Sequence, residues 1–157
     1  PGFVSKGSLF NVDVNASGLG TEDLAGFDID VRFDDSVIGF TGDYMLGSEL
    51  MDPISGQEDL SWGEYVPGVV NVAEVSYLLD FSGQPDAFTL ATLSFEALEV
   101  GSSGLTISFA DVSDPEGNAL RAALPGQVQV VPLPPAVALL GFAAAGLLGF
   151  RRRAGSA

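Results

Sequence analysis

Residues 26–33, GFDIDVRF, decide the fold, because apolar and charged side chains alternate without a break along them. The apolar set is Phe27, Ile29, Val31 and Phe33, and the charged set is Asp28, Asp30 and Arg32. Successive side chains of a β-strand point to opposite faces, so this pattern predicts a strand with one buried face and one wet face.

Similar strand patterns recur on both sides of this stretch, separated by clusters of Gly, Pro, Asp and Ser. We expect strands in residues 9–14, 37–40, 60–66, 69–79, 88–98, 105–112 and 119–130, and a short helical turn near 48–51. Eight or nine short strands with turn residues between them, and no long helical period before residue 131, predict an antiparallel β-sandwich. Eleven phenylalanines are available to fill its core.

Composition excludes several classes of function. All 21 acidic residues and three of the six basic ones precede residue 131, a net charge of −18 for that part, while the last 27 residues carry +3. Such an acidic body repels phosphate backbones, so we expect no nucleic-acid partner. The absence of Cys and His excludes thiolate sites, histidine-based triads and most zinc sites.

Three segments together resemble successive parts of a bacterial cohesin-like domain. They are GFDIDVRFDDSVIGF (26–40), DAFTLATLSFEAL (86–98) and GLTISFADVSDPEGNAL (104–120). In that family a strand leads into a YDPSVLxF turn, matched here by residues 33–40. An FTLATLxF strand follows, matched by 88–95, and then a DxxGN turn, matched by 114–118. The resemblance covers residues 8–130. It implies a jelly-roll sandwich of about nine strands for the domain at 1–130, without implying a dockerin partner.

The last 27 residues, 131–157, form a separate segment. They read VPLPP, then the uncharged run AVALLGFAAAGLLGF, then the cluster Arg151, Arg152 and Arg153. Residues 136–150 would span about 22 Å as a helix at ~1.5 Å per residue. Including residues 131–135 brings the length close to a bilayer core of ~30 Å. We therefore expect one transmembrane helix, with the arginines on the cytoplasmic side and the acidic domain outside.

This tail resembles the PEP-CTERM class of sorting signals in its VPLPA-type variant. Val131, Pro132, Leu133 and Pro134 match the motif, and Pro135 stands where the motif has Ala. The resemblance implies export across the inner membrane and processing by an exosortase-type enzyme. It implies transfer to the outer envelope or the extracellular matrix, often in association with exopolysaccharide. The alternative is an unprocessed anchor that keeps the domain on the periplasmic side of the inner membrane.

Small residues recur every four positions within the apolar run, at Gly141, Ala145 and Gly149. Such a stripe allows close approach of a second helix. It motivates an alternative function, a single-span accessory subunit of a larger inner-membrane complex. The plainer interpretation is that small residues only moderate the hydrophobicity of the segment.

Two groups in the body are candidate sites. Asp111, Asp114, Glu116 and Asn118 offer oxygen atoms of the kind that Ca²⁺ binds, although a solvated turn explains them equally well. Glu58, Asp59 and Glu64 surround Trp62 and Tyr65, a composition that could hold a sugar or, in a third hypothesis, hydrolyse one. The sequence otherwise predicts no cofactor. Its main prediction is a non-enzymatic exported envelope protein that acts through protein–protein or protein–exopolysaccharide contacts.

Overall fold

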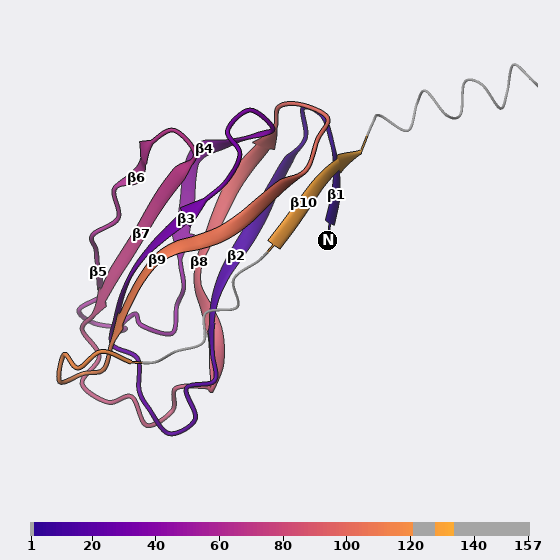
Figure 1. The fold of residues 1–157 in the computed structure, drawn as a ribbon. Helices are drawn as coiled ribbons and strands as arrows, with labels where there is room; N and C mark the ends of the chain where they lie inside the picture. Colours follow the sequence, from indigo (N-terminus) through magenta and orange to yellow (C-terminus); the bar gives the residue numbers. More distant parts are fainter. Residues whose placement is uncertain (1, 121–127, 134–157) are drawn as a thin grey trace, which may run out of the picture.

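The fold is an all-β sandwich of two sheets (Figure 1). A computed structural model describes residues 2–120 and 128–133 of the chain. The larger sheet has seven strands, in the order β1-β10-β9-β3-β7-β5 with β6 also paired to β7, and the smaller has three, in the order β2-β8-β4. Their bounds are Gly2–Ser5 (β1), Leu9–Ser17 (β2), Gly26–Arg32 (β3), Ile38–Leu46 (β4), Gln57–Asp59 (β5), Gly63–Val66 (β6), Val69–Ser76 (β7), Ala87–Ala97 (β8), Ser103–Ser113 (β9) and Val128–Leu133 (β10).

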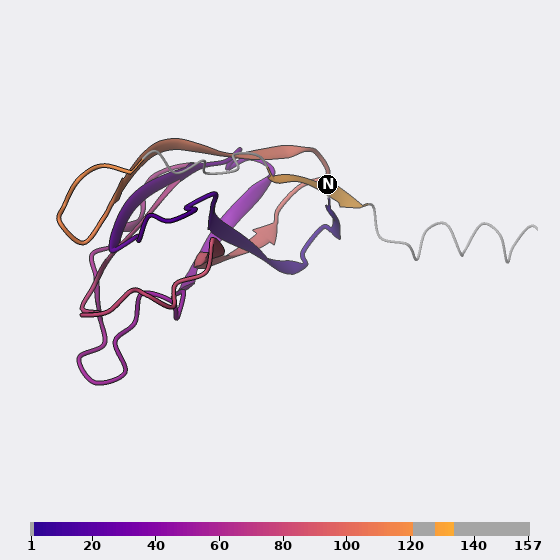
Figure 2. The ribbon, with the colours of Figure 1, turned by 90° about the horizontal axis from the view of Figure 1, so that it is seen from below.

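The core lies between the two sheets, which appear as separate layers in Figure 2. Phe95 on β8 is fully buried, and its ring centroid lies 5.8 Å from those of Phe10 and Phe40 and 5.2 Å from that of Phe33. Phe33 follows β3 of the larger sheet, whereas the other three rings come from the smaller one. Each such aromatic pair contributes about 1 kcal/mol beyond its buried area, so this cluster joins the two layers.

Strand β3 is the stretch from which the fold was predicted, and it lies inside the larger sheet. It pairs antiparallel with β7 on one side and with β9 on the other. Phe27, Ile29 and Val31 are buried, whereas Asp28 and Arg32 are exposed, as their alternation predicts. The outer face of β3 therefore carries charge across the middle of a sheet.

Some elements differ from the expectation. About nine strands were expected and ten are found in the described residues, because β1 was not foreseen and β5 precedes β6 in the irregular segment. Strand β4 extends well beyond residue 40. Residues 48–51 form a turn in which the Met51 amide donates to the Ser48 carbonyl at 3.3 Å. The alternation of apolar and polar residues is weak in β1, β4 and β5 because these strands are short or half-exposed at a sheet edge.

Strand β10 crosses the boundary expected between residues 130 and 131. It pairs antiparallel with β9 and parallel with β1, so that Val131, Pro132 and Leu133 lie opposite Phe3, Val4 and Ser5. The first three residues of the predicted sorting motif therefore belong to the sheet. Pro134 and Pro135, the stripe Gly141, Ala145 and Gly149, and the cluster Arg151, Arg152 and Arg153 lie outside the described residues.

The described part of the chain, residues 2–120 and 128–133, contains no helix with the length and apolar character needed to cross a membrane.

Candidate functional site

The outer face of β3, β7 and β9 carries a compact set of polar and aromatic side chains. Strand register places Asp28 opposite Ala73 of β7 and Asp111 of β9. It likewise places Asp30 opposite Asn71 and Phe109. Residues that lie opposite in neighbouring strands project to the same side of a sheet. The alternation that buries Ile29 thus collects three carboxylates on the wet side.

The segment that leads from β5 into β6 brings two more aromatic side chains to this face, Trp62 just before β6 and Tyr65 within it. The Leu60 amide donates to the Ala73 carbonyl at 3.0 Å, and the Trp62 amide donates to Asn71 Oδ1 at 3.2 Å. Trp62 and Tyr65 then meet edge to face, with ring centroids 6.1 Å apart and an interplanar angle of 88°. Hydrogen bonds from this segment to the backbone and to the Asn71 side chain of β7 therefore hold the chain that carries the indole.

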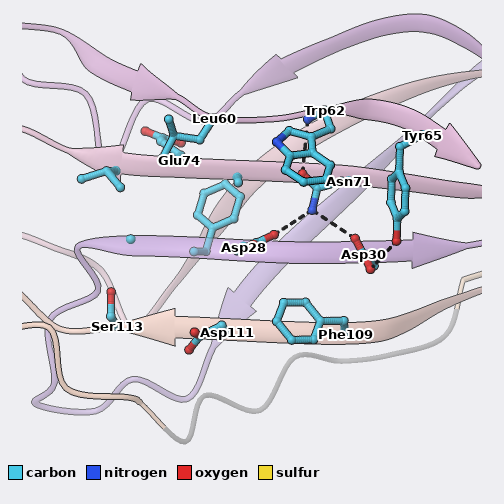
Figure 3. A pocket seen from close by; sticks show the side chains of 14 residues that line it. Asp28, Asp30, Leu60, Trp62, Tyr65, Asn71, Glu74, Phe109, Asp111 and Ser113 are labelled. Atoms are coloured by element: carbon cyan, nitrogen blue, oxygen red, sulfur yellow. Dashed lines mark hydrogen bonds between the residues drawn. The ribbon is translucent and has the colours of Figure 1, made fainter.

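Asn71 links the two parts of the site (Figure 3). Its Nδ2 donates to Asp28 Oδ1 at 2.7 Å and to Asp30 Oδ1 at 3.0 Å. The Tyr65 hydroxyl donates to Asp30 Oδ2 at 2.8 Å, and this bond raises the pKa of Tyr65 above its usual value. One amide and one phenol thus hold two neighbouring carboxylates in defined positions.

Together these residues line an open hollow of about 690 Å³. Its walls include Trp62, Tyr65 and Phe109, with exposed fractions of 77%, 45% and 49%. Several large aromatic side chains exposed together around a hollow are typical of a binding surface. A hollow of this size and lining can receive a side chain or a small ring of a partner.

The acids that flank Trp62 and Tyr65 in the sequence do not line this hollow. Glu58 accepts a hydrogen bond from the Tyr77 hydroxyl at 2.6 Å, and Glu64 accepts one from the Gly68 amide at 2.9 Å. Asp59 Oδ2 accepts a hydrogen bond from the Tyr44 hydroxyl at 2.9 Å, and this bond connects β5 to β4 of the other sheet. The three groups are separately bonded to their surroundings, an arrangement that does not resemble a pair of cooperating catalytic carboxylates.

The four candidate calcium ligands are only partly brought together. Asp114 Oδ1 accepts a hydrogen bond from the backbone amide of Asn118 at 2.7 Å. Asp114 Oδ2 accepts another from the side-chain amide of Asn118 at 2.8 Å. Both its oxygens therefore close a turn, and these bonds lower the pKa of Asp114. Asp111 lies on β9 in the hollow, and Glu116 is exposed. Across the described residues, no group of three or more acidic side chains is arranged to hold a metal ion, and calcium binding stays a prediction.

The sequence analysis did not predict Asp28, Asp30 or Phe109 as site residues, and it also missed two polar residues of β7. Asn71 and Glu74 are both in β7, where every other residue before Ser76 is apolar, and both are buried. Burial, with repulsion from Asp59, raises the pKa of Glu74 to about 7, and neither of its carboxylate oxygens has a hydrogen-bond partner. A polar residue that interrupts a buried strand is the signal that could have identified them.

Comparison with known proteins gives the fold. No protein-family model matches the sequence, and no curated protein matches it significantly. Among solved structures, a non-cellulosomal cohesin from Archaeoglobus fulgidus is 15% identical, with a TM-score of 0.65 over 89% of this chain and 93% of that one.

Two further structures agree. The cohesin module of a family 33 glycoside hydrolase from Clostridium perfringens is 15% identical, with a TM-score of 0.64 over 85% of this chain and 93% of that one. A chain from a type I cohesin–dockerin complex of Clostridium thermocellum is 14% identical, with a TM-score of 0.63 over 84% and 95%. At identities this low, structural similarity establishes the fold alone. The TM-scores confirm the fold that the sequence resemblance implied. The chain therefore has the cohesin fold, an antiparallel all-β sandwich.

Proposed function

We propose that this chain is a non-enzymatic protein-binding domain of an exported envelope protein, and that the hollow on the outer face of β3, β7 and β9 is its binding surface. The observation that carries the proposal is the exposure of Trp62, Tyr65 and Phe109 around an open hollow. Apolar side chains left in water at a concave site gain free energy when a partner covers them.

The fold supports the same proposal. One structurally similar chain comes from a complex in which a cohesin binds a dockerin, so this sandwich can serve protein–protein contact. The chain has neither Cys nor His, so the candidate site has no thiolate nucleophile and no imidazole base. Its carboxylates at Asp28 and Asp30 are tied to Asn71, which suits a rigid recognition surface better than proton transfer.

Export and anchoring belong to the proposal through the tail. Residues 131–157 would direct the protein to the inner membrane, where an exosortase-type enzyme cleaves near Pro134 and Pro135 and passes the domain to the envelope. If the tail is instead retained as a helix beside other membrane proteins, the chain is an accessory subunit with a periplasmic sandwich. The intact mass of the mature protein separates these cases, because only processing gives a chain that ends near residues 134–136.

A glycan is the second candidate ligand, because an exposed indole beside carboxylates also suits a sugar ring. Trp62 and Tyr65 offer apolar faces, and Asp28 and Asp111 offer acceptors. Exopolysaccharide is therefore the partner to compare with protein in the test of the surface.

The binding surface is tested with the full chain immobilised and exposed to an envelope extract of its own host. Wild-type protein is expected to retain a protein partner that Trp62→Ala and Phe109→Ala lose at least tenfold, a typical effect for a buried aromatic anchor. Met45→Ala is the matched control, because Met45 is 68% exposed on the smaller sheet. Equal retention by all four proteins would overturn the assignment of this face, and retention of polysaccharide alone would favour the glycan.

A further inference from the structure

The residues that line the hollow carry an excess of negative charge. Asp28 and Asp111 lie directly opposite each other across the β3–β9 pair, and Asp30 is two residues along β3. Like charges in opposite positions of a sheet destabilise it. None of the described residues that line the hollow is basic. Arg32, two residues beyond Asp30 on the outer face of β3, is the nearest cation along that strand, and it does not line the hollow. In the described part of the chain, the ion pair between Lys6 and Glu99 is the only one, so no carboxylate of this face is paired.

The arrangement of the remaining walls says what kind of cation would fit. Trp62 and Tyr65 stand on the β7 side of the carboxylates, and Phe109 stands on the β9 side (Figure 3). Asn71 and Tyr65 already donate to Asp28 and Asp30, which fixes these carboxylates before any ligand arrives. A ligand here meets fixed negative charge between flat aromatic surfaces.

A bare metal ion does not satisfy this geometry, because no three acidic side chains among the described residues converge on one point. An ammonium group would meet the charge and be attracted to an aromatic face, but it is a compact point charge that cannot bridge two carboxylates in a fixed plane while it stacks on a ring. A guanidinium group is planar, donates hydrogen bonds from a fixed fork that matches carboxylates, and stacks on aromatic rings. A guanidinium group can therefore bind the carboxylates and stack on an aromatic ring at the same time.

We infer that the hollow seats an arginine side chain of the partner protein, stacked on Trp62 and hydrogen-bonded to Asp28 and Asp111. The inference rests on the proposed function, since it names the group by which a protein partner would be recognised at the same surface. Charge complementarity favours it over a neutral glycan, which would leave the repulsion between Asp28 and Asp111 in place.

Trp62 is the single tryptophan of the chain, so its fluorescence reports on this site alone. The full chain is titrated with the capped tripeptide acetyl-Gly-Arg-Gly-amide, and with versions in which citrulline or lysine replaces arginine. Citrulline has almost the shape of arginine without its charge. We expect a saturable change of emission with the arginine peptide, at least fivefold weaker binding of the lysine peptide, and no response to citrulline. Binding should be lost near 0.5 M salt.

Substitutions of single acidic residues test where the arginine peptide binds. Asp28→Asn and Asp111→Asn are each expected to weaken binding of the arginine peptide about fivefold, the upper range for a partly exposed ion pair. Asp13→Asn is the matched control, because Asp13 is an exposed acid on β2 of the other sheet that accepts a hydrogen bond from Thr92. Equal loss in all three variants would mean non-specific attraction by the net charge and would overturn the inference.

Failure of the arginine inference can be distinguished from failure of the proposed protein-binding surface. If the envelope partner is lost in Trp62→Ala but is held equally by wild type, Asp28→Asn and Asp111→Asn, the surface binds protein without an arginine and only this inference fails. A response to methyl glucoside with none to the arginine peptide would overturn both and assign the hollow to a glycan.

Discussion

Asn71 shows how one side chain can define a surface. Its amide oxygen accepts the Trp62 backbone amide, while its nitrogen donates to both Asp28 and Asp30. A buried amide whose donors and acceptor are all used is held in one orientation, and it holds its partners too. The positions of the indole and of two carboxylates therefore depend on a single residue of β7.

Glu74 is the most unusual ionisable group of the described residues. By alternation it points to the same side of β7 as Val70 and Val72, toward the space between the sheets. Asp59 lies opposite it on β5, and both carboxylate oxygens of Glu74 lack a partner. An ionised carboxylate in this place has neither water nor a donor to stabilise it, so folding favours its protonated form.

The first prediction follows from this group. Because the pKa of Glu74 is raised from 4.5 to about 7, its contribution to stability is complete below pH 4.5 and is lost as pH rises through 7. The free energy of unfolding should fall by about 3 kcal/mol over that interval, at ~1.4 kcal/mol for each unit by which the pKa is raised. Glu74→Gln should remove this fall, as measured by urea unfolding at several pH values.

The control for this prediction is Glu96→Gln, which changes an exposed acid on β8. It should keep the wild-type dependence on pH. The measurement belongs above pH 4.5, since the lowered pKa values of Asp52, Asp80 and Asp114 act in the opposite sense in more acidic solution. An unchanged slope in Glu74→Gln would show that Glu74 is not the titrating group.

The residues of the site illustrate what the sequence could and could not predict. The outward position of Asp28 and Asp30 follows from alternation within β3, and the sequence analysis found it. Their contact with Asn71 joins positions 43 and 41 residues apart, so it depends on how β3 and β7 align. That register comes from packing of the whole core, which no local pattern encodes.

At the scale of the element, β4 and β8 approach each other very closely where β4 ends. The Gly47 amide donates to the Leu90 carbonyl at 2.7 Å, and a Cβ at position 47 would clash with the carbonyl oxygen of Thr89. Only a residue without a side chain allows this contact between backbones. Gly47 therefore sets how tightly the edge of the smaller sheet is closed.

The second prediction concerns this edge. Gly47→Ala should destabilise the protein by roughly 2–3 kcal/mol, because the backbone must move apart to accept the methyl group. Gly83→Ala is the matched control, since an added Cβ there meets nothing within 4 Å and should change stability by less than ~0.5 kcal/mol. Chemical denaturation of both variants measures the difference. Equal stability of the two would contradict the close approach of β4 and β8.

Individual elements were predicted with unequal success for a physical reason. Strands with one buried face, such as β3 and β8, carry a clear alternation, and the sequence located them well. Strands β5 and β6 are short, lie at the edge and are mostly exposed, so their residues are not selected for period two. Their place is set by pairing with β7, and two aromatic residues of the site depend on it, Trp62 between the two strands and Tyr65 in β6.

At the scale of the whole molecule, charge is the dominant surface property. The sequence has 21 acidic and six basic residues, and only Lys6 and Arg32 are basic within residues 2–120. Repulsion among so many like charges opposes the compact state, although it favours solubility. The same field would attract the cationic partner proposed above from a distance and accelerate its association.

The third prediction is that salt stabilises the protein. Raising NaCl from 20 mM to 0.5 M shortens the range of repulsion to a few ångströms, so the Tm should rise by several degrees at pH 7. The control is the same measurement at pH 4.5, close to the isoelectric point of about 4.1, where the increase should largely disappear. A Tm that falls with salt at pH 7 would show that attractive ion pairs, rather than repulsion, dominate this surface.

The pairing of β10 has a mechanical consequence. Hydrogen bonds between strands run across them, and β10 is bonded to β9 on one side and to β1 on the other. A pull on the chain beyond Leu133 acts along the length of β10, so these bonds are loaded together in shear rather than opened one by one like a zipper. A domain tethered through this strand would resist tension at its attachment point, as flowing liquid or a moving cell would impose.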